Sequence, residues 1–411
     1  MPLTRRQIFL RRRVAFFGSL AVVLAAVVYL ANTGLAPVPA TAAELSTPAS
    51  LTQPAAQPTW PTSGESAIGA VGFPGVLGSA GPQESVPIAS VTKIVTSLVV
   101  LDKKPLTGTE PGPTITFTDA DVAIYYKVVA MNGSVAPVVS GMKLSERQVL
   151  QAMLLPSANN YSISLGVWAY GSMDAYLAAA ATWLKAHGMT GTTVADTSGI
   201  SPASRSTPAD LVALGKLVVA NPALASIVAM PTAKLPVIGI VKNTNKLLGR
   251  HGITGIKTGT TDAAGACLLF SANVSIDSRT VTLVGVALGG RTHTELDRAV
   301  TALIDSVKPG FRNVTLTKKG ASYGTYATVW GQTSKAVTAK AASVLVWSDT
   351  PVSAKAKIRK LTLGAAGDPV GAVDFTVGDR SVSVPLLLAR TVSDPGPAWR
   401  VSHPGELSAS R

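Results

Sequence analysis

The stretch Ile88-Ala89-Ser90-Val91-Thr92-Lys93 lies between a Gly/Pro-rich segment and an apolar run over residues 94–101. If a helix begins near Ser90, its hydroxyl and the amine of Lys93 project from the same face, because three residues make almost one turn. A serine is activated only if a neighbour takes its proton, and a lysine can do so only where burial or another cation disfavours its charge. The motif also fits a helix N-cap followed by a surface lysine. Other features of the sequence are needed to choose between these two interpretations.

Length and composition indicate a globular protein of two or three domains. The chain has 411 residues, and a hydrophobic content of 47% is enough for a sizeable core. Lys and Arg outnumber Asp and Glu by 36 to 22, but five of the positive charges are arginines within the first 13 residues. Basic residues do not form a stripe interleaved with aromatics, so no nucleic-acid partner is predicted.

Cysteine and histidine usage argues against a metal centre. The single cysteine, Cys267, excludes a disulfide framework and a cysteine-ligated metal within the chain, and we expect it to be a small buried hydrophobe. The four histidines lie far apart without ligand-like spacing, which argues against a zinc enzyme. Of these, His251 is predicted to be a surface loop residue.

The N-terminus predicts export. Residues 14–31 form an uncharged apolar run behind the basic segment 1–13, a length at the short end for a transmembrane span and the long end for a signal peptide. The positive-inside rule places the arginines in the cytoplasm and the rest outside. Ala40-Thr41-Ala42 resembles a signal-peptidase site but lies about ten residues beyond the run. An uncleaved anchor is therefore favoured over a cleaved signal.

Composition divides the remainder into four parts. Residues 32–64, rich in Ala, Pro, Thr and Ser, are predicted to be a linker without a core. Interleaved strand and helix patterns predict an α/β domain over residues 65–308. Period-two alternation between Gly/Asp/Pro turns predicts a small all-β domain over residues 309–400 without helices. The tail, residues 401–411, carries no amphipathic anchor.

Elements are predicted from periodicity and capping residues. The α/β domain should contain a hairpin over 66–71 and 75–79, irregular β structure over 113–143, and helices over 144–155, 161–187 with a break near Gly171, and 208–220. It should close with strands 264–272 and 280–288 and a helix over 292–306. The β domain should contain strands over 314–316, 323–330, 337–347, 357–363, 370–377 and 380–388.

Two further motifs follow the first. Ser157-Ala158-Asn159 comes just after a predicted helix, where a hydroxyl and an amide could point into a cleft, although the same residues also make an ordinary turn. Lys257-Thr258-Gly259-Thr260 precedes a strand-like run and could equally be a lysine at a strand end. The order Ser-x-x-Lys, Ser-x-Asn, Lys-Thr-Gly is the ordered set found in penicillin-binding proteins and serine β-lactamases.

The sequence around these motifs resembles the serine-type D-alanyl-D-alanine carboxypeptidases, the low-molecular-mass penicillin-binding proteins. The resemblance covers residues 65–308 and includes the stretches 87–93, 155–159, 196–202, 243–248 and 255–265. It implies a β-lactamase/transpeptidase fold, in which an antiparallel sheet is flanked by helices and joined by a helical subdomain, followed here by the small all-β domain.

The resemblance also implies an activity and a location. The enzyme would remove the terminal D-alanine from peptidoglycan stem pentapeptides through an acyl-serine intermediate, and β-lactam antibiotics would inhibit it. It would act at the outer face of the bacterial cytoplasmic membrane, held by the N-terminal segment.

Residue roles are implied in the same way. Ser90 would be the nucleophile, Lys93 the general base, and Ser157 the group that passes the proton to the leaving amine. Asn159 would hold Lys93 and the substrate amide. The terminal carboxylate would be bound by Lys257, whose charge also disfavours protonation of Lys93, and by Thr258. Gly259 would let the substrate lie against the strand, and the backbone N–H groups of Ser90 and Thr260 would form the oxyanion hole.

Departures and rivals are also visible in the sequence. Asn160 has no predicted role, and either Arg291 or Arg298 could supply the arginine that helps hold the substrate carboxylate in some relatives. A class A β-lactamase needs a glutamate between the second and third motifs, and residues 160–256 contain none. A Ser-His-Asp hydrolase is disfavoured, because no histidine lies near a nucleophile-elbow pattern. A catalytically silent wall-binding protein and a peptidoglycan endopeptidase stay open.

Overall fold

The computed structural model describes residues 4–46 and 48–407. The chain forms two compact units: one comprises residues 56–311, and the other joins the chain before residue 56 to the chain after residue 311. The first contains all three sequence motifs.

An antiparallel sheet of five strands is the framework of the first unit, with the order β10-β11-β12-β2-β3. The predicted hairpin and the two predicted adjacent strands are confirmed within it. The edge strand β10 carries the Lys-Thr-Gly motif. The strands are β2 (Glu65–Ala70), β3 (Gly78–Ala80), β10 (Ile253–Thr261), β11 (Gly265–Ile276) and β12 (Arg279–Gly290).

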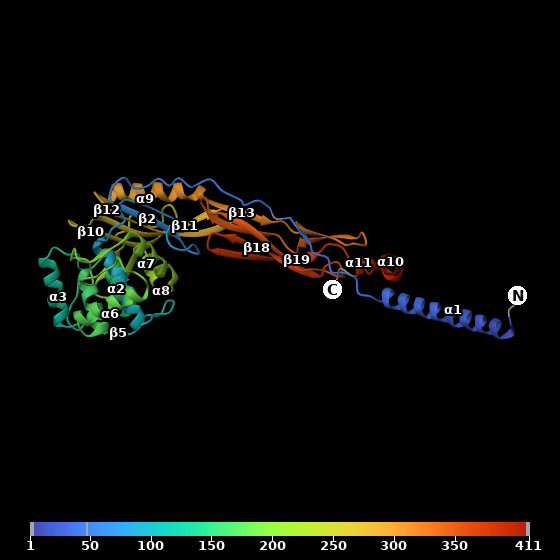
Figure 1. The fold of residues 1–411 in the computed structure, drawn as a ribbon. Coiled ribbons are helices and arrows are strands. Elements are labelled where there is room, and N and C mark those ends of the chain that lie inside the picture. Colours follow the sequence, from blue (N-terminus) through green and yellow to red (C-terminus); the bar gives the residue numbers. More distant parts are fainter. Residues whose placement is uncertain (1–3, 47, 408–411) are drawn as a thin grey trace. The chain divides into compact units, whose positions relative to one another are not determined.

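Helices cover both faces of this sheet (Figure 1). The helix α9 (His293–Val307) packs on β11 and β12 from one side, and α7 (Pro208–Ala220) and α8 (Pro222–Val228) pack on the other. Gly215 of α7 allows the close approach, because a Cβ there would lie 2.5 Å from Val284 Cγ1. The sheet is therefore buried on both faces.

A helical layer surrounds the first motif. The 3-10 turn η1 (Ala89–Val91) leads into α2 (Thr92–Lys103), whose first ten residues are buried. The predicted helices are confirmed as α4 (Glu146–Leu154), α5 (Asn159–Tyr170), α6 (Met173–Ala186) and α7, and the predicted break falls at Gly171, a left-handed C-cap. Ser145 forms a capping box with Gln148, as its sequence predicts.

The prediction of irregular β structure over 113–143 is wrong at its centre, where α3 (Asp119–Ala130) lies between the short strands β5 (Thr114–Thr116) and β6 (Lys143–Ser145). Val128 is buried and the other residues of α3 are partly or fully exposed, so the helix shows no apolar period. Its start signal was present, because Thr118 forms a capping box with Asp121.

The second unit contains an antiparallel sheet of six strands in the order β1-β14-β15-β19-β18-β17, and β13 pairs with β16. The predicted single strand 337–347 is two strands, and the predicted strand 357–363 lies instead at 352–358. The expectation of no helix after residue 309 is wrong, because α10 (Gly396–Ser402) and α11 (Pro404–Leu407) follow the last strand. The strands are β13 (Phe311–Thr317), β14 (Ser322–Ala327), β15 (Thr333–Thr338), β16 (Ala342–Trp347), β17 (Val352–Ile358), β18 (Pro369–Val377) and β19 (Arg380–Leu388).

Part of the predicted linker belongs to the second unit. The strand β1 (Glu44–Leu45) pairs with β14, and isolated bridges join Thr41 to Leu361 and Leu51 to Val352. Val38 is buried as well. Backbone pairing needs no hydrophobic pattern, which is why composition alone indicated a linker here.

Four short strands and the N-terminal helix complete the chain. The pairs are β4 (Val86–Pro87) with β7 (Arg205–Ser206) and β8 (Thr232–Leu235) with β9 (Gly239–Lys242). The helix α1 (Arg5–Gly34) is the one described helix that is by itself long and apolar enough to cross a membrane.

Glu146, the first residue of α4, is fully buried. Within the described residues, neither of its carboxylate oxygens has a hydrogen-bond partner. Burial raises its pKa from 4.5 to about 7, and the charge of Lys104 opposes this only in part. The folded protein therefore favours the protonated carboxyl.

Glu146 should make stability depend on pH. The pKa of Glu146 is about 7 in the folded state and 4.5 in the unfolded state, so between these pH values folding is accompanied by the uptake of a proton. Stability is therefore lost as pH rises from about 4.5 to about 7. We expect Glu146→Gln to remove this loss, so that its melting temperature exceeds that of the parent at about pH 8 by more than at about pH 5. Calorimetry of both proteins at the two pH values measures the difference, and equal differences would contradict the prediction.

Candidate active site

Ser90 and Lys93 lie at the start of the buried helix. Ala89 is in the left-handed region with φ 46°, a conformation that only a well-supported backbone retains. From this turn Ser90 and Lys93 face each other, and Lys93 Nζ is 2.8 Å from Ser90 Oγ. Lys93 is fully buried, so the interpretation as a surface lysine is wrong.

Lys93 is held by groups from two other segments. Its Nζ donates to Asn159 Oδ1 at 2.5 Å and to the carbonyl oxygen of Ser198 at 3.2 Å. Burial lowers the pKa of Lys93 well below its usual value, and the charge of Lys257 lowers it further, against the opposing effect of Asp196. The amine is therefore placed and tuned to accept a proton.

The segment that presents Ser198 is organised by Asp196. Its carboxylate accepts from the backbone N–H groups of Ser198 at 2.6 Å and Ser201 at 2.7 Å. Gly199 is required beside it, because at φ 80° a Cβ would lie 1.8 Å from the carbonyl oxygen of Ala89. This segment is thus fixed against the turn that carries Ser90.

The strand β10 brings the third motif against the nucleophile. Lys257 is buried and donates from Nζ to the carbonyl oxygen of Thr258 at 2.9 Å, and burial lowers its pKa to about 7. A Cβ on Gly259 would be 3.0 Å from the backbone nitrogen of Ser90. Glycine therefore allows the strand to approach the nucleophile's own N–H.

The second motif also faces this space. Ser157 follows α4, has φ 65° and is 7% exposed. Asn159 begins α5, and its backbone N–H donates to the carbonyl oxygen of Ser134 at 2.7 Å. The residues do form a turn, as their composition allows, but the turn points its polar groups toward Lys93 and the cavity.

A cavity of about 390 Å³ joins these residues. Residues from all three motifs line it, together with residues for which the sequence predicted no role. The lining consists of Ser90, Ser134, Ser157, Asn243, Thr244, Lys246, Thr258, Gly259, Thr260, His293 and Asp297.

Two of the residues without a predicted role, Thr244 and His293, contact β10. Thr244 Oγ1 is 2.6 Å from Thr258 Oγ1, and His293 Nε2 is 2.6 Å from Thr260 Oγ1. His293 is the first residue of α9, and burial lowers its pKa, an effect that Asp297 opposes. The stretch 243–248 belonged to the family pattern, but nothing in the sequence placed His293 next to it.

Asn160, which had no predicted role, positions the opposite rim. Its side chain accepts from the backbone N–H of Ala136 at 3.1 Å and donates to the carbonyl oxygen of the same residue at 3.0 Å. Tyr161 donates from its hydroxyl to the carbonyl oxygen of Pro137 at 2.6 Å. The loop that carries Ser134 is therefore bonded to the first turn of α5.

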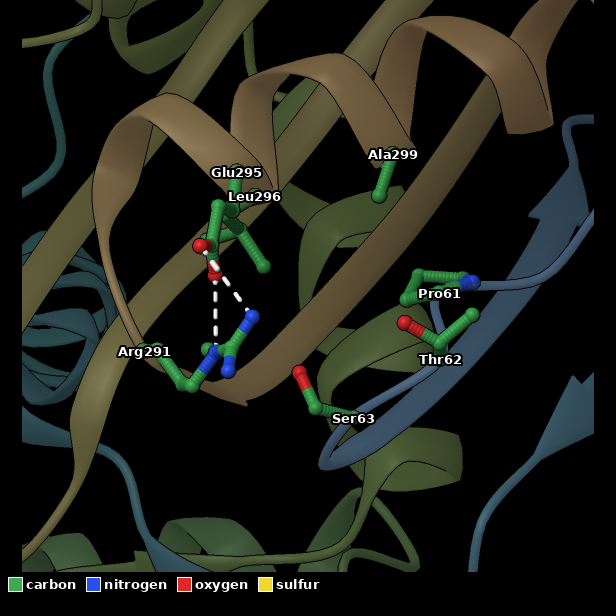
Figure 2. Close-up of a pocket in the computed structure, with 8 residues that line it drawn as sticks. Pro61, Thr62, Ser63, Arg291, Glu295, Leu296 and Ala299 are labelled. Carbon is green, nitrogen blue, oxygen red and sulfur yellow. Dashed lines mark hydrogen bonds and ion pairs between the residues drawn. The ribbon is translucent and has the colours of Figure 1, made fainter.

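Neither candidate arginine lines the cavity. Arg291 is 79% exposed and forms an ion pair with Glu295 beside a separate pocket that includes Thr62 and Ser63 (Figure 2). Arg298 also lies outside the lining. The position facing Thr260 is taken by His293.

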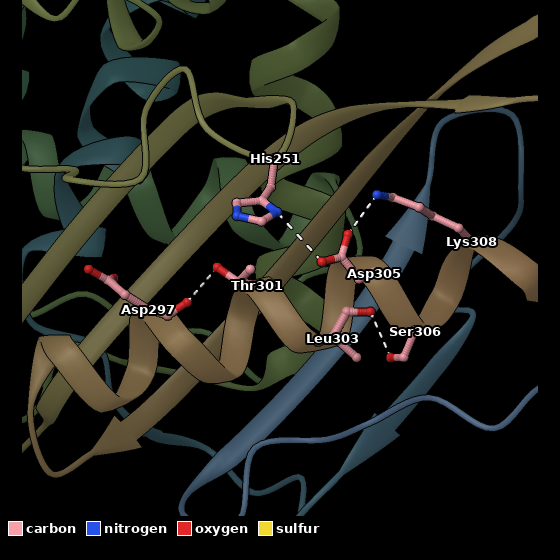
Figure 3. Close-up of polar contacts among 7 residues, drawn as sticks. All are labelled: His251, Asp297, Thr301, Leu303, Asp305, Ser306 and Lys308. Atoms are coloured by element: carbon pink, nitrogen blue, oxygen red, sulfur yellow. Dashed lines mark hydrogen bonds and ion pairs between the residues drawn. The ribbon is translucent and has the colours of Figure 1, made fainter.

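The remaining expectations concern residues away from the cavity. His251 is 43% exposed and faces Asp305, which also pairs with Lys308 (Figure 3), so its prediction as a surface histidine is confirmed. Cys267 is fully buried as predicted, and burial raises its pKa to about 11. In the described parts of the chain, His, Cys, Asp and Glu form no group of three that could hold a metal ion.

The fold and the three-motif cleft define a DD-peptidase of the penicillin-binding type. The sequence profile of the D-alanyl-D-alanine carboxypeptidase family matches residues 74–292, and the chain belongs to this family of serine hydrolases. The expected fold and enzyme class are thereby confirmed.

Individual relatives of this chain are also named as D-alanyl-D-alanine peptidases. A D-alanyl-D-alanine endopeptidase of Pseudomonas aeruginosa is 32% identical over 53% of this chain and 69% of its own length. The D-alanyl-D-alanine carboxypeptidase DacC of Escherichia coli is 27% identical over 79% of this chain and 83% of its own. DacB2 of Mycobacterium tuberculosis, also named a carboxypeptidase, is 33% identical over 43% and 59%.

Solved structures show the same fold. The Streptomyces K15 DD-transpeptidase is 26% identical, with a TM-score of 0.52 over 62% of this chain and 98% of its own. Penicillin-binding protein 5 of Haemophilus influenzae, at 19% identity, has a TM-score of 0.57 over 84% and 100%. This last likeness is one of fold alone.

The low pKa of Lys257 predicts a pH limit on ligand binding. Above about pH 7 its ammonium loses the proton, so attraction for a ligand carboxylate should weaken. We expect the second-order rate of acylation by benzylpenicillin to fall through this pH, and Lys257→Arg to move the fall to higher pH because a guanidinium stays charged. Stopped-flow measurements across pH would contradict this if both proteins showed the same falling limb.

The rim geometry predicts which basic residue matters. His293→Ala removes the contact to Thr260 and should slow acylation by roughly tenfold, the effect of losing about 1.4 kcal/mol. Arg291→Ala and Arg298→Ala serve as matched controls and should stay within about twofold of the parent. A larger loss in either arginine variant than in His293→Ala would reverse the assignment.

Proposed function

We propose that the protein removes the terminal D-alanine from peptidoglycan stem pentapeptides through an acyl-serine intermediate, and that β-lactams inhibit it by acylating the same serine. The contact between Lys93 Nζ and Ser90 Oγ in a cleft that also buries Lys257 carries this proposal. Burial lowers the pKa of Lys93, and the nearby charge of Lys257 lowers it further, so Lys93 can be neutral and act as a base.

Acylation would begin when Ser90 attacks the carbonyl carbon of the penultimate D-alanine while Lys93 accepts the hydroxyl proton. The oxyanion that forms would accept from the backbone N–H groups of Ser90 and Thr260, each donor being worth about 10²–10³ in rate. Proximity of Gly259 to the Ser90 nitrogen supports this arrangement. The C–N bond then breaks, and Ser157 passes a proton to the leaving amine.

The enzyme would bind the substrate on both sides of the scissile bond. Lys257 and Thr258 would bind the terminal carboxylate, with Thr244 orienting the Thr258 hydroxyl. Asn159 would hold the substrate amide as well as Lys93. Water would then attack the acyl-enzyme carbonyl and release the shortened stem peptide, with Lys93 again moving the proton. The proposed reaction uses protein groups and water, and none of its steps requires a metal or cofactor.

The rivals differ in what they predict for this site. A silent scaffold would not need Lys93 buried against Ser90, and a β-lactamase of class A would need the glutamate that residues 160–256 lack. Endopeptidase activity has specific support, because cleavage of a cross-link would use the same acyl transfer to a serine and the Pseudomonas aeruginosa relative is named an endopeptidase. The two activities differ in the leaving group.

We also propose that α1 anchors the enzyme in the cytoplasmic membrane with both units on the outer side. Its 30 residues include the apolar run, and arginines precede that run. Peptidoglycan and β-lactams are then the expected partners, and nucleic acid is not one.

The test is intact-mass spectrometry of the full chain in detergent during exposure to benzylpenicillin. We expect a lasting adduct on Ser90 that is absent in Ser90→Ala and present in Ser79→Ala, an exposed serine of β3 that serves as the matched control. Drug hydrolysis without an adduct would favour a β-lactamase. The absence of both an adduct and hydrolysis would favour a scaffold. Release of D-alanine from a pentapeptide, compared with cleavage of a cross-linked dimer, separates carboxypeptidase from endopeptidase.

A further inference from the structure

The outer end of α1 packs against the C-terminal helix α10. A Cβ on Gly34, the last residue of α1, would lie 3.6 Å from Pro397 Cβ and 3.9 Å from Val401 Cγ2. Gly34 is buried although the rest of α1 is almost entirely exposed. The apolar helix therefore ends against α10.

An arginine fixes this contact. Arg400 of α10, which is 8% exposed, donates from Nε to the carbonyl oxygen of Ala36 at 2.7 Å. Its two terminal nitrogens donate to both carboxylate oxygens of Asp394, at 2.6 and 2.7 Å. A buried guanidinium held by three hydrogen bonds, two of them to one carboxylate, is a firm connection, so the chain leaving α1 is held by the β unit two residues after the helix ends.

The position of the bilayer surface follows from α1 itself. An apolar run over residues 14–31 extends about 27 Å as a helix, close to the thickness of the hydrocarbon layer. If α1 spans the membrane, the outer boundary of that layer lies near residue 31. Gly34 is three residues further, or about 4.5 Å, so the residues packed on it lie at the depth of the lipid headgroups.

Apolar and aromatic side chains lie beside this contact, together with the exposed His403, which stacks on Trp399. Trp399 of α10 packs edge-to-face on Trp330 with ring centroids 5.8 Å apart, and Trp330 follows Val329 in the turn between β14 and β15. Val329 is 51% exposed and Leu35 is 85% exposed. Tryptophan is enriched at membrane–water interfaces. Trp330 and Trp399 are both half-buried, and within the described residues the buried Nε1 of Trp330 has no hydrogen-bond partner, so Trp330 would contribute its ring and not its N–H.

We propose that Leu35, Val329, Trp330 and Trp399 form a membrane-contact patch that lies in the outer headgroup layer of the bilayer that α1 spans. The occupant is the lipid surface. The second unit thereby rests on the membrane. This inference depends on the proposed anchoring by α1, and the experiment below separates the two.

Retention of α1 is part of the same inference. Cleavage after Ala42 would remove Gly34, the carbonyl acceptor of Arg400 and the buried Val38, and would break the bridge from Thr41 to Leu361. The segment at the predicted signal-peptidase site is thus built into the folded β unit.

The test places single nitroxide labels on the full chain reconstituted in vesicles of phosphatidylethanolamine and phosphatidylglycerol. The native Cys267 is fully buried, so an added cysteine can be labelled alone. Val329→Cys reports on the patch and Val23→Cys on the middle of α1. Asp379→Cys lies in the turn between β18 and β19, at the other end of the strands from the turn that holds Val329.

We expect oxygen, which concentrates in lipid, to relax the labels at positions 23 and 329 more strongly than a water-soluble nickel chelate, and the reverse at position 379. Lipid exposure at 23 with water exposure at 329 would overturn the patch and leave the anchor intact. Water exposure at 23 would overturn both. A benzylpenicillin adduct on the same samples reports separately on the proposed catalytic function.

The role of Arg400 is tested with a charge-matched pair. In Arg400→Gln the bond to Ala36 is lost, so the label at position 329 should shift toward nickel accessibility while the label at 23 does not. Arg390→Gln, which removes an exposed charge from the same unit, should leave both labels unchanged. An equal response of the two variants would overturn the connection through Arg400.

Discussion

The fold of the first unit is arranged around a buried lysine, Lys93, whose hydrogen-bond partners within the described residues include no carboxylate. Lys93 meets a hydroxyl, an amide oxygen and a backbone carbonyl, all of which can bond the charged or the neutral amine. Such a group is stable inside a protein only if several segments keep those acceptors in place. The turn at Ala89, the start of α5, the loop at Asp196 and the edge strand β10 converge on this point, and their left-handed residues and glycines are required by that convergence.

The sequence predicted which motif residues meet in this cleft better than it predicted the residues around them. Ser90, Lys93, Asn159 and Lys257 were found because their residue types and order are constrained by the reaction. Capped, apolar elements such as α4, α7 and α9 were also predicted, since burial imposes a period on them. His293 was not, because its meeting with Thr260 depends on how α9 crosses the sheet end, and no local pattern encodes that crossing.

The other errors have a common cause. The helix α3 is mostly exposed, and the chain around Thr41 and Leu51 contributes backbone hydrogen bonds instead of side chains. Both lack the hydrophobic repeat on which sequence interpretation depends. The helix α10 was missed for a related reason, because its seven residues are too few to show a period and its fixed point, Arg400, bonds a carbonyl near the opposite end of the chain.

The first turn of α5 serves two structures at once. Asn159 binds Lys93 with its side chain and the loop at Ser134 with its backbone, while the next two residues bond the same loop at Ala136 and Pro137. The rim of the cleft and Lys93 are therefore connected through the first turn of α5, so a movement of one would move the other. A ligand that pushes this rim outward would also displace Lys93 from Ser90, so bulk on that side of a ligand would change the contact between these two side chains.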